Sequence, residues 1–152
     1  MSDISIDPRS QGQPLVAFRV AGQDYCIDIM AVREIRGWTP ATALPHAPPH
    51  VRGVINLRGQ VVPILDLAAR LGLPSPEPDG RHVIVIVAVG ERVLGLLVEA
   101  VSEILSVPQE AVHPAPDFDG ETSLVQAVIT LEERMFRFLD LGDVLSAEAV
   151  AA

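Results

Sequence analysis

Basic and aromatic residues are both scarce in this sequence, which bears on nucleic-acid binding. The chain has 11 Lys and Arg residues against 20 Asp and Glu residues, and its formal net charge at pH 7 is −9. A duplex-binding protein needs clustered Lys and Arg to neutralise phosphates, and this balance argues against one. Aromatic residues make up only 4% of the chain, too few for a platform that stacks a single strand. We therefore expect no nucleic-acid partner.

The sequence also lacks long apolar runs and has a single cysteine. The apolar run at 83–89 is far shorter than the roughly 18 residues of a membrane span. Residues 1–14 are polar and contain no apolar core of a secretory signal. Cys26 has no second cysteine to pair with, and its place in an apolar stretch indicates a buried thiol. These features predict a soluble, cytoplasmic protein that does not insert into a membrane.

Catalytic and metal-binding constellations are missing as well. No histidine or helix N-terminus that would activate the Cys26 thiol is evident beside it in the sequence. His46 and His50 are four residues apart, the spacing of two zinc ligands on one helix face, but two prolines between them forbid that helix. The sequence thus predicts no enzyme, no bound metal and no cofactor.

What the chain does contain is a series of short apolar strands separated by turns. We expect strands at 15–20, 25–27, 53–57, 60–65, 81–89, 91–98, 102–107, 124–131 and 134–139. Residues 28–34 fit either one helical turn or a bent strand, and their apolar spacing favours a short helix. The run at 83–87 is apolar on both faces, which indicates a strand that lies between two cores.

Three polar or imino residues mark boundaries along this series. Asp66 and Asp140 each occupy the N-cap position of a short helix, because an aspartate side chain accepts hydrogen bonds from free backbone amides at a helix start. These helices are expected to extend through Leu71 and Leu145. Pro63 marks its strand as an edge strand or a bulge, since proline cannot donate to a sheet.

The second half of the chain repeats features of the first. Gly22 and Gly90 follow similar apolar residues and are 90 − 22 = 68 apart. Ile35 and Ile104 end two Val-x-Glu-Ile elements and are 104 − 35 = 69 apart, so one inserted residue is expected. Further on, Ile-Asn-Leu and Ile-Thr-Leu begin two segments with a constant offset of 74. Short apolar stretches also resemble one another by chance, but the shared order favours a duplicated β unit with a seam between its copies.

This organisation predicts one folded region at 15–146, built from two small barrels. The first barrel is expected mainly at 15–72 and the second mainly at 81–146, joined by a linker at 73–80 that is rich in proline and acid. Residues 1–14 would form a flexible leader and residues 147–152 a tail.

A longer motif resembles a known family. Residues 53–67 read Gly-Val-Ile-Asn-Leu-Arg-Gly-Gln-Val-Val-Pro-Ile-Leu-Asp-Leu, similar to the signature of the CheW family of chemotaxis coupling proteins. The similarity continues in Glu-Ile-Arg-Gly at 34–37, Val-Ser-Glu-Ile-Leu at 101–105 and Pro-Ala-Pro-Asp-Phe at 114–118, and it spans about residues 15–145. It implies a mainly β fold of two five-stranded, SH3-like barrels packed together, with short helices.

The resemblance also implies a function and a set of partners. A family member would be a non-catalytic adaptor that couples the cytoplasmic helical hairpin tip of a chemoreceptor to the regulatory domain of the CheA histidine kinase. The receptor tip would lie in the groove between the barrels as a helix in a groove. Matched motif by motif, the groove residues are Val32, Glu34, Gly53, Arg58, Val101 and Ile104. The residue pattern by itself favours burial in the core for the three aliphatic members of this set.

The kinase contact is expected on the first barrel. The apolar residues Ile35, Trp38 and Leu44 are its candidates, although Trp38 stands where the family varies. Two alternatives stay open: a same-fold adaptor in a non-flagellar chemosensory pathway, and a small β-barrel enzyme or ligand-binding domain that uses the seam as a pocket. The second alternative requires a deep enclosed cavity with convergent polar groups.

Overall fold

Short strands joined by tight turns dominate the architecture. The computed structural model describes residues 14–75, 77–115 and 124–145. In chain order the strands are β1 (Leu15–Val20), β2 (Gln23–Asp28), β3 (Val32–Gly37), β4 (Val51–Leu57), β5 (Gln60–Asp66), β6 (Val83–Val89), β7 (Arg92–Val98), β8 (Ala100–Leu105), β9 (Val112–Pro114), β10 (Val125–Leu131) and β11 (Arg134–Leu139). The helices are the single 3-10 turns η1 (Ile29–Ala31) and η2 (Gln109–Ala111) and the short helices α1 (Leu67–Arg70) and α2 (Leu141–Val144).

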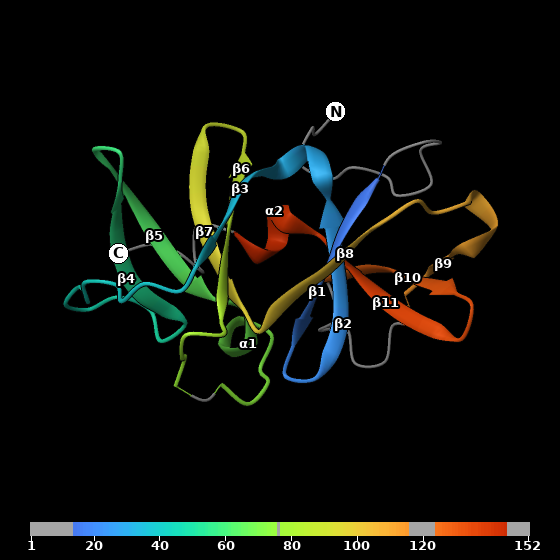
Figure 1. Cartoon of the computed structure of the whole chain (residues 1–152), viewed down its shortest axis with the longest axis horizontal. Coiled ribbons are helices and arrows are strands. Elements are labelled where there is room, and N and C mark those ends of the chain that lie inside the picture. The colour runs from blue at the N-terminus through green and yellow to red at the C-terminus, as the bar shows by residue number, and fades with distance from the viewer. Residues whose placement is uncertain (1–13, 76, 116–123, 146–152) are drawn as a thin grey trace.

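These strands form two sheets that lie side by side (Figure 1). Sheet 1 has six strands in the order β8-β1-β2-β11-β10-β9, and sheet 2 has five strands in the order β3-β6-β7-β5-β4. Most neighbours are antiparallel, but β5 pairs with β7 and β11 pairs with β2 in parallel. The predicted mainly β fold of two subdomains is confirmed, with one difference: the short strand β9, which was not predicted, gives sheet 1 a sixth strand.

Three clusters of buried side chains hold the sheets together. The central cluster lies between the sheets and includes Val16, Phe18, Tyr25 and Ile27 of sheet 1 and Val85, Val87, Leu94 and Leu96 of sheet 2. The outer cluster of sheet 1 includes Leu15, Ala17, Cys26 and Phe136. The outer cluster of sheet 2 includes Ile55, Val62, Ile84 and Ile86. Strand β6 alternates between the central cluster and the outer cluster of sheet 2, as its apolar run predicted, because successive side chains point to opposite faces.

The register of the hairpins shows where the repeat is exact. Val20 pairs with Gln23 in the β1–β2 hairpin, and Val89 pairs with Arg92 in the β6–β7 hairpin. The two residue pairs are equivalent in the repeat, because each residue of the second pair lies 69 positions after its counterpart: 89 − 20 and 92 − 23 both equal 69. The prediction of an inserted residue between this hairpin and the Val-x-Glu-Ile element is therefore wrong. The offset is 69 on both sides, and only the turn glycine differs, because Gly90 lies 68 residues after Gly22.

The parallel pairs extend the same relation to the later strands. Ile64 of β5 lies opposite Gly95 of β7, and Phe138 of β11 lies opposite Cys26 of β2. Because 95 − 26 = 69 and 138 − 64 = 74, the two contacts are equivalent. The first copy thus consists of β1–β5 and α1, and the second consists of β6–β8, β10, β11 and α2.

The two copies exchange strands, which corrects the predicted barrel boundaries. Sheet 1 combines β1 and β2 of the first copy with β8, β10 and β11 of the second, and sheet 2 combines β3–β5 with β6 and β7. The predicted division into a barrel at 15–72 and a barrel at 81–146 is therefore wrong for the sheets. Strand alternation reports which residues are buried but not which strand lies alongside, so the pattern could not reveal the exchange. The predicted tail at 147–152, and all but the last residue of the predicted leader at 1–14, lie outside the described residues.

The predicted helix caps are confirmed, and of the two predicted places for Pro63, an edge strand or a bulge, the edge strand is wrong. The Asp66 side chain accepts from the Ala69 amide at the start of α1, and the Asp140 side chain accepts from the Asp143 amide at the start of α2. Strand β5 is an interior strand, and the register shift of the β4–β5 pair lies between Val51 and Gly53, opposite Leu65 and Ile64, next to Pro63 and not at it.

The hydrogen bonds of its neighbours explain why Pro63 is tolerated there. It lies opposite Val54, whose backbone N–H and carbonyl both bond to Thr42 and therefore point away from β5. The missing N–H of Pro63 thus removes no hydrogen bond between β4 and β5, and the parallel pairing with β7 begins only at Ile64.

Residues 28–34 take both of the predicted conformations in turn. The Asp28 side chain accepts from the Met30 amide at 2.8 Å and caps η1, and β3 then begins at Val32. The strand expected at 102–107 lies two residues earlier, as β8. Within the ranges that the structure describes, no helix has the length and apolar character to cross a membrane.

Candidate functional site

Four aliphatic side chains border the central cluster at the edge strands β3 and β8. Val32 and Ile35 of β3 lie opposite Val87 and Val85, and Val101 and Ile104 of β8 lie opposite Phe18 and Val16. Directly opposite residues of an antiparallel pair share a face, and all four partners belong to the central cluster. We call Val32, Ile35, Val101 and Ile104 the aliphatic rim. The rim is symmetric under the repeat, since 101 − 32 and 104 − 35 both equal 69.

The aliphatic rim is half buried and half exposed. Val32 and Val101 are partly buried and pack against the central cluster. Ile35 is 48% exposed and Ile104 is 63% exposed, although both lie on strands next to buried neighbours. Val32, Val101 and Ile104, the aliphatic members of the predicted groove set, therefore all lie on the central face, and Ile35 lies there with them. An exposed apolar strip beside a core is a common feature of docking surfaces.

An ion pair between Glu34 and Arg58 joins the two edges of sheet 2, on the face of the sheet opposite to the aliphatic rim. Glu34 lies opposite Ile86, a member of the outer cluster of sheet 2. Nη2 of Arg58 donates to Oε1 of Glu34 at 2.9 Å, and Nη1 of Arg36 donates to Oε2 at 3.2 Å. The hydrogen bond from Arg58 is the main cause that holds the pKa of Glu34 below its ordinary value, and the bond from Arg36 acts in the same direction. Because β3 is one edge of sheet 2, the pair joins this edge to the β4–β5 hairpin at the opposite side.

The residues next to Arg58 determine the conformation of the hairpin turn that carries it. Arg58 has a positive φ of 53°, and Gly59 has a φ of 87°. The Asn56 side chain accepts from the Gly59 amide at 2.8 Å, which stabilises the turn. The Arg58 side chain is 69% exposed, so its remaining N–H groups are accessible to a partner.

The second copy contains a counterpart that the sequence analysis missed. Glu103 occupies the position of Glu34, since 103 − 34 = 69, and Arg134 of the β10–β11 hairpin donates to its carboxylate. Arg134 also lies 3.7 Å from Asp24, and these acidic partners raise the pKa of its guanidinium. The repeat offset applied to Glu34 would have found Glu103. In both sheets, therefore, a glutamate on an edge strand forms an ion pair with an arginine on a hairpin.

Gly53 has a structural reason to be glycine, different from the predicted role in the groove. It is buried, with a φ of 143°. A Cβ added there would lie 2.3 Å from the Thr42 carbonyl oxygen, far inside van der Waals contact. The neighbouring residue Val54 forms two backbone hydrogen bonds with Thr42, at 2.8 and 2.9 Å. Gly53 thus lets the 38–50 loop approach β4.

The three predicted kinase-contact residues do not share one face. Ile35 belongs to the aliphatic rim, whereas Trp38 is partly buried and packs against the outer cluster of sheet 2. Leu44 lies in the 38–50 loop and is exposed. The structure therefore separates Ile35 from Trp38.

Reactive groups in the described ranges do not converge. Cys26 is buried in the outer cluster of sheet 1, and burial raises the pKa of its thiol far above the ordinary value. In residues 14–75, 77–115 and 124–145 there is no group of three or more His, Cys, Asp or Glu side chains arranged to hold a metal ion.

Comparison with known proteins decides the family. Residues 14–149 match the CheW-like domain family. The chain belongs to the CheW family. Chemotaxis protein CheW of Rhizobium meliloti (strain 1021) is 53% identical over 139 residues, which cover 90% of each chain. The probable chemotaxis protein CheW of Rhizobium etli is 49% identical over 134 residues, covering 87% of this chain and 86% of the relative.

A solved structure extends the similarity to the fold. The crystal structure of the scaffolding protein TtCheW from Thermoanaerobacter tengcongensis superimposes with a TM-score of 0.84 at 26% identity. The superposition covers 92% of this chain and 97% of that chain. The family and the fold predicted from the Asn-Leu-Arg-Gly motif are both confirmed. In this CheW-family chain, the aliphatic rim exposes Ile35 and Ile104 beside the central cluster, and the Glu34–Arg58 pair lies on the other face of sheet 2.

Proposed function

We propose that this protein is a non-catalytic adaptor in a cytoplasmic chemosensory array, where it couples the helical tip of a chemoreceptor to the regulatory domain of the CheA kinase. The observation that carries the proposal is the aliphatic rim, which exposes Ile35 and Ile104 along the seam of a CheW-family fold. Such a strip provides apolar area for a helix, and flanking charges set its register.

The symmetry of the rim supports a helical hairpin as the occupant. Val32 and Ile35 repeat as Val101 and Ile104, so the seam offers two equivalent aliphatic pairs from two strands. A hairpin tip offers two helices, and each helix can contact one pair. Gly53 and the Glu34–Arg58 pair lie outside the rim, and we assign them indirect roles in holding the loop and β3 in place.

The proposed receptor contact can be tested by replacing an exposed aliphatic residue of the rim with aspartate. Ile104→Asp and Ile35→Asp are compared with Met135→Asp, a matched change at an apolar residue of β11 that is 54% exposed. Binding of a receptor tip fragment is measured by calorimetry at moderate salt. We expect each rim variant to lose at least about tenfold in affinity and Met135→Asp to retain it. Equal affinity of all four proteins would contradict the assignment.

The role of Arg58 is tested by reversing its ion pair. Arg58→Glu places two glutamates together and should weaken receptor binding while the protein remains folded. If Arg58 acts by holding Glu34, the double variant Arg58→Glu with Glu34→Arg restores the pair in the opposite sense and recovers much of the affinity. If Arg58 instead contacts the receptor directly, the double variant binds as poorly as Arg58→Glu, and the indirect role is wrong.

The kinase arm uses the exposed part of the 38–50 loop. We propose that the exposed Leu44 contributes to the surface for the kinase regulatory domain, that Trp38 anchors the start of this loop on the outer cluster of sheet 2, and that Ile35 belongs to the receptor surface. Leu44→Asp should weaken binding of the regulatory domain and leave receptor binding unchanged. Loss of kinase binding in Ile35→Asp but not in Leu44→Asp would reverse this division.

A further inference from the structure

One arginine differs from the others in having no partner within the described part of the chain. The sequence contains no lysine, so its 11 basic residues are all arginines. Within residues 14–75, 77–115 and 124–145, each arginine except Arg33 forms a hydrogen bond or an ion pair with a carboxylate or a backbone carbonyl. Arg33 forms neither there, and it is exposed. Its N–H groups are therefore available to an acceptor on a partner.

A β-bulge places Arg33 on the same face as the aliphatic rim. The register of β3 against β6 shifts between Val32 and Glu34, so Arg33 is an extra residue without a partner of its own on β6. Glu34 faces the outer cluster of sheet 2, and successive side chains of a strand point to opposite faces. Arg33 therefore lies on the central face, between Val32 and Ile35 of the rim.

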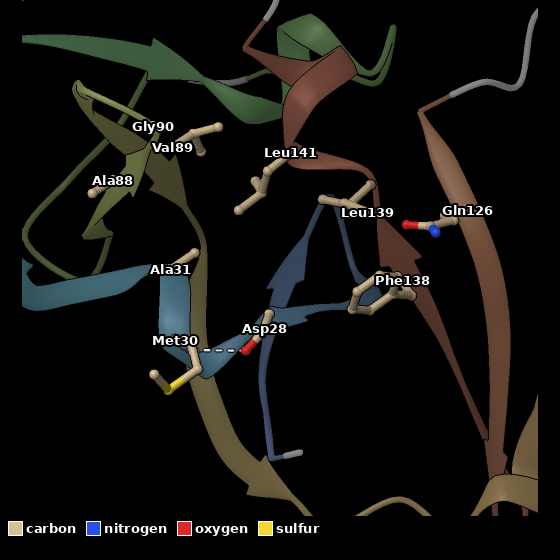
Figure 2. Close-up of a pocket in the computed structure, with 10 residues that line it drawn as sticks. All are labelled: Asp28, Met30, Ala31, Ala88, Val89, Gly90, Gln126, Phe138, Leu139 and Leu141. Atoms are coloured by element: carbon tan, nitrogen blue, oxygen red, sulfur yellow. Dashed lines mark hydrogen bonds between the residues drawn. The ribbon is translucent and has the colours of Figure 1, made fainter. Parts of the chain in front are cut away.

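The turn before β3 holds the start of this bulge in place. Oδ1 of Asp28 accepts from the Met30 amide at 2.8 Å, as Figure 2 shows. At the other end of η1, the backbone N–H of Val32 donates to the carbonyl of Ile29. Contacts within the chain thus position Arg33 beside the rim before any partner binds, which lowers the ordering cost of an interaction there.

The equivalent position of the second copy is neutral and already forms a hydrogen bond. Ser102 corresponds to Arg33, since 102 − 33 = 69, and it lies in the equivalent register shift of β8 against β1. Its Oγ donates to the carbonyl oxygen of Ala17 at 3.2 Å. The rim is thus symmetric in its four aliphatic side chains, but it has a guanidinium beside β3 and a hydroxyl beside β8.

This difference bears on the orientation in which a helical hairpin binds. The β5–β7 and β11–β2 contacts are reciprocal between the two copies, so the copies are related by an approximate twofold rotation. The two helices of an antiparallel hairpin likewise exchange places when the hairpin is turned by half a turn. The aliphatic rim by itself would therefore accept a hairpin in either orientation.

We propose that Arg33 selects one of these orientations, by pairing with a carboxylate of the receptor-tip helix that lies along β3. The inference rests on the proposed function and specifies the chemistry of its partner: the helix at β3 carries an Asp or Glu at this contact, and the helix at β8 needs none. A planar guanidinium can donate two parallel hydrogen bonds to one carboxylate, so the pair fixes the register of the helix as well as its orientation.

The first test measures the affinity of the full chain for a receptor tip fragment, by calorimetry at moderate salt. We expect Arg33→Glu to lose at least about tenfold, because it opposes two carboxylates, and Arg33→Ser to lose about two- to fivefold. Arg33→Ser takes the residue of the second copy and serves if the glutamate variant fails to fold. The control Arg81→Glu makes the same charge change at a side chain that is 93% exposed in the turn before β6, and it should stay within about twofold.

The outcomes separate this inference from the function on which it rests. Full affinity of the folded Arg33 variants, or an equal loss in Arg33→Glu and Arg81→Glu, would refute the role of Arg33 and leave the proposed function intact. A wild-type chain that does not bind the fragment would refute both.

The second test observes the orientation directly. A spin label attached to one helix of the fragment broadens the backbone amide NMR signals of the strand beside it. In the wild type, we expect the label to broaden either β3 or β8 more strongly. The double variant Arg33→Ser with Ser102→Arg moves the guanidinium to β8 and should transfer the stronger broadening to the other strand. Equal broadening of both strands in the wild type, or an unchanged pattern in the double variant, would overturn the proposal.

Discussion

Gly53→Ala separates a structural role for this glycine from a role in partner binding. The added Cβ would lie 2.3 Å from the carbonyl oxygen and 2.6 Å from the carbonyl carbon of Thr42. Both neighbours are backbone atoms, so no side-chain rotation relieves the overlap. The φ of 143° is moreover a conformation that residues with a Cβ rarely adopt. Either β4 changes its backbone conformation or the 38–50 loop moves away.

The cost of both routes can be estimated from the contacts that are lost. Movement of the loop breaks the two hydrogen bonds between Thr42 and Val54, each worth about 0.5–1.5 kcal/mol. Retention of the strained backbone costs about 1–3 kcal/mol. We therefore expect Gly53→Ala to lower the free energy of unfolding by about 2–4 kcal/mol. For a chain of this length that is a fall in Tm of about 5–15 °C.

The measurement is urea unfolding followed by circular dichroism, with thermal unfolding as a second readout. Gly37→Ala is the matched control, because Gly37 lies on β3 with no atom near its would-be Cβ and no positive φ. Its unfolding free energy should stay within about 0.5 kcal/mol of the wild type. If Gly53→Ala is as stable as Gly37→Ala, the close approach of Thr42 does not explain this glycine. A loss of receptor affinity at unchanged stability would return Gly53 to the binding surface.

Three further substitutions or reactions test the core and the caps. Burial raises the pKa of Asp140, so the stability that its neutral form contributes is present below the ordinary value of 3.8 and is lost as pH rises through the raised folded pKa. Asp140→Asn keeps the cap and should raise Tm at pH 7 but not below that ordinary value; a lower Tm at pH 7 would contradict this. The buried Cys26 thiol should react with a disulfide reagent only as fast as the protein unfolds, and rapid labelling of the native protein would show that it is accessible. Gly95→Ala places a Cβ 2.7 Å from Ile64 and 2.8 Å from Ile84, and it should cost about 1–3 kcal/mol in urea unfolding; an unchanged midpoint would mean that these side-chain ends move freely.

Local structure was predictable because local residues determine it. The hairpin at Arg58 and Gly59 and the caps at Asp66 and Asp140 follow from turn and capping chemistry that acts over a few residues. The strand exchange between the copies was not predictable in the same way. Parallel pairing of β5 with β7 and of β11 with β2 joins strands far apart in sequence, and side-chain alternation carries no information on the partner strand.

The candidate site was predictable in part through the repeat. Val32, Val101 and Ile104, which the motifs predict as groove residues, share the central face, and the offset of 69 places Ile35 with them. Gly53 was assigned to the groove by its motif, but its contact with Thr42 depends on a loop whose path the sequence did not indicate.

The most direct measurement is the footprint of a receptor tip fragment on the full chain, read from backbone amide chemical shifts. The account predicts simultaneous shifts in β3 and β8, centred on Ile35 and Ile104. A footprint restricted to one of these two strands, or one that avoids both, would contradict the claim that the tip binds across the seam.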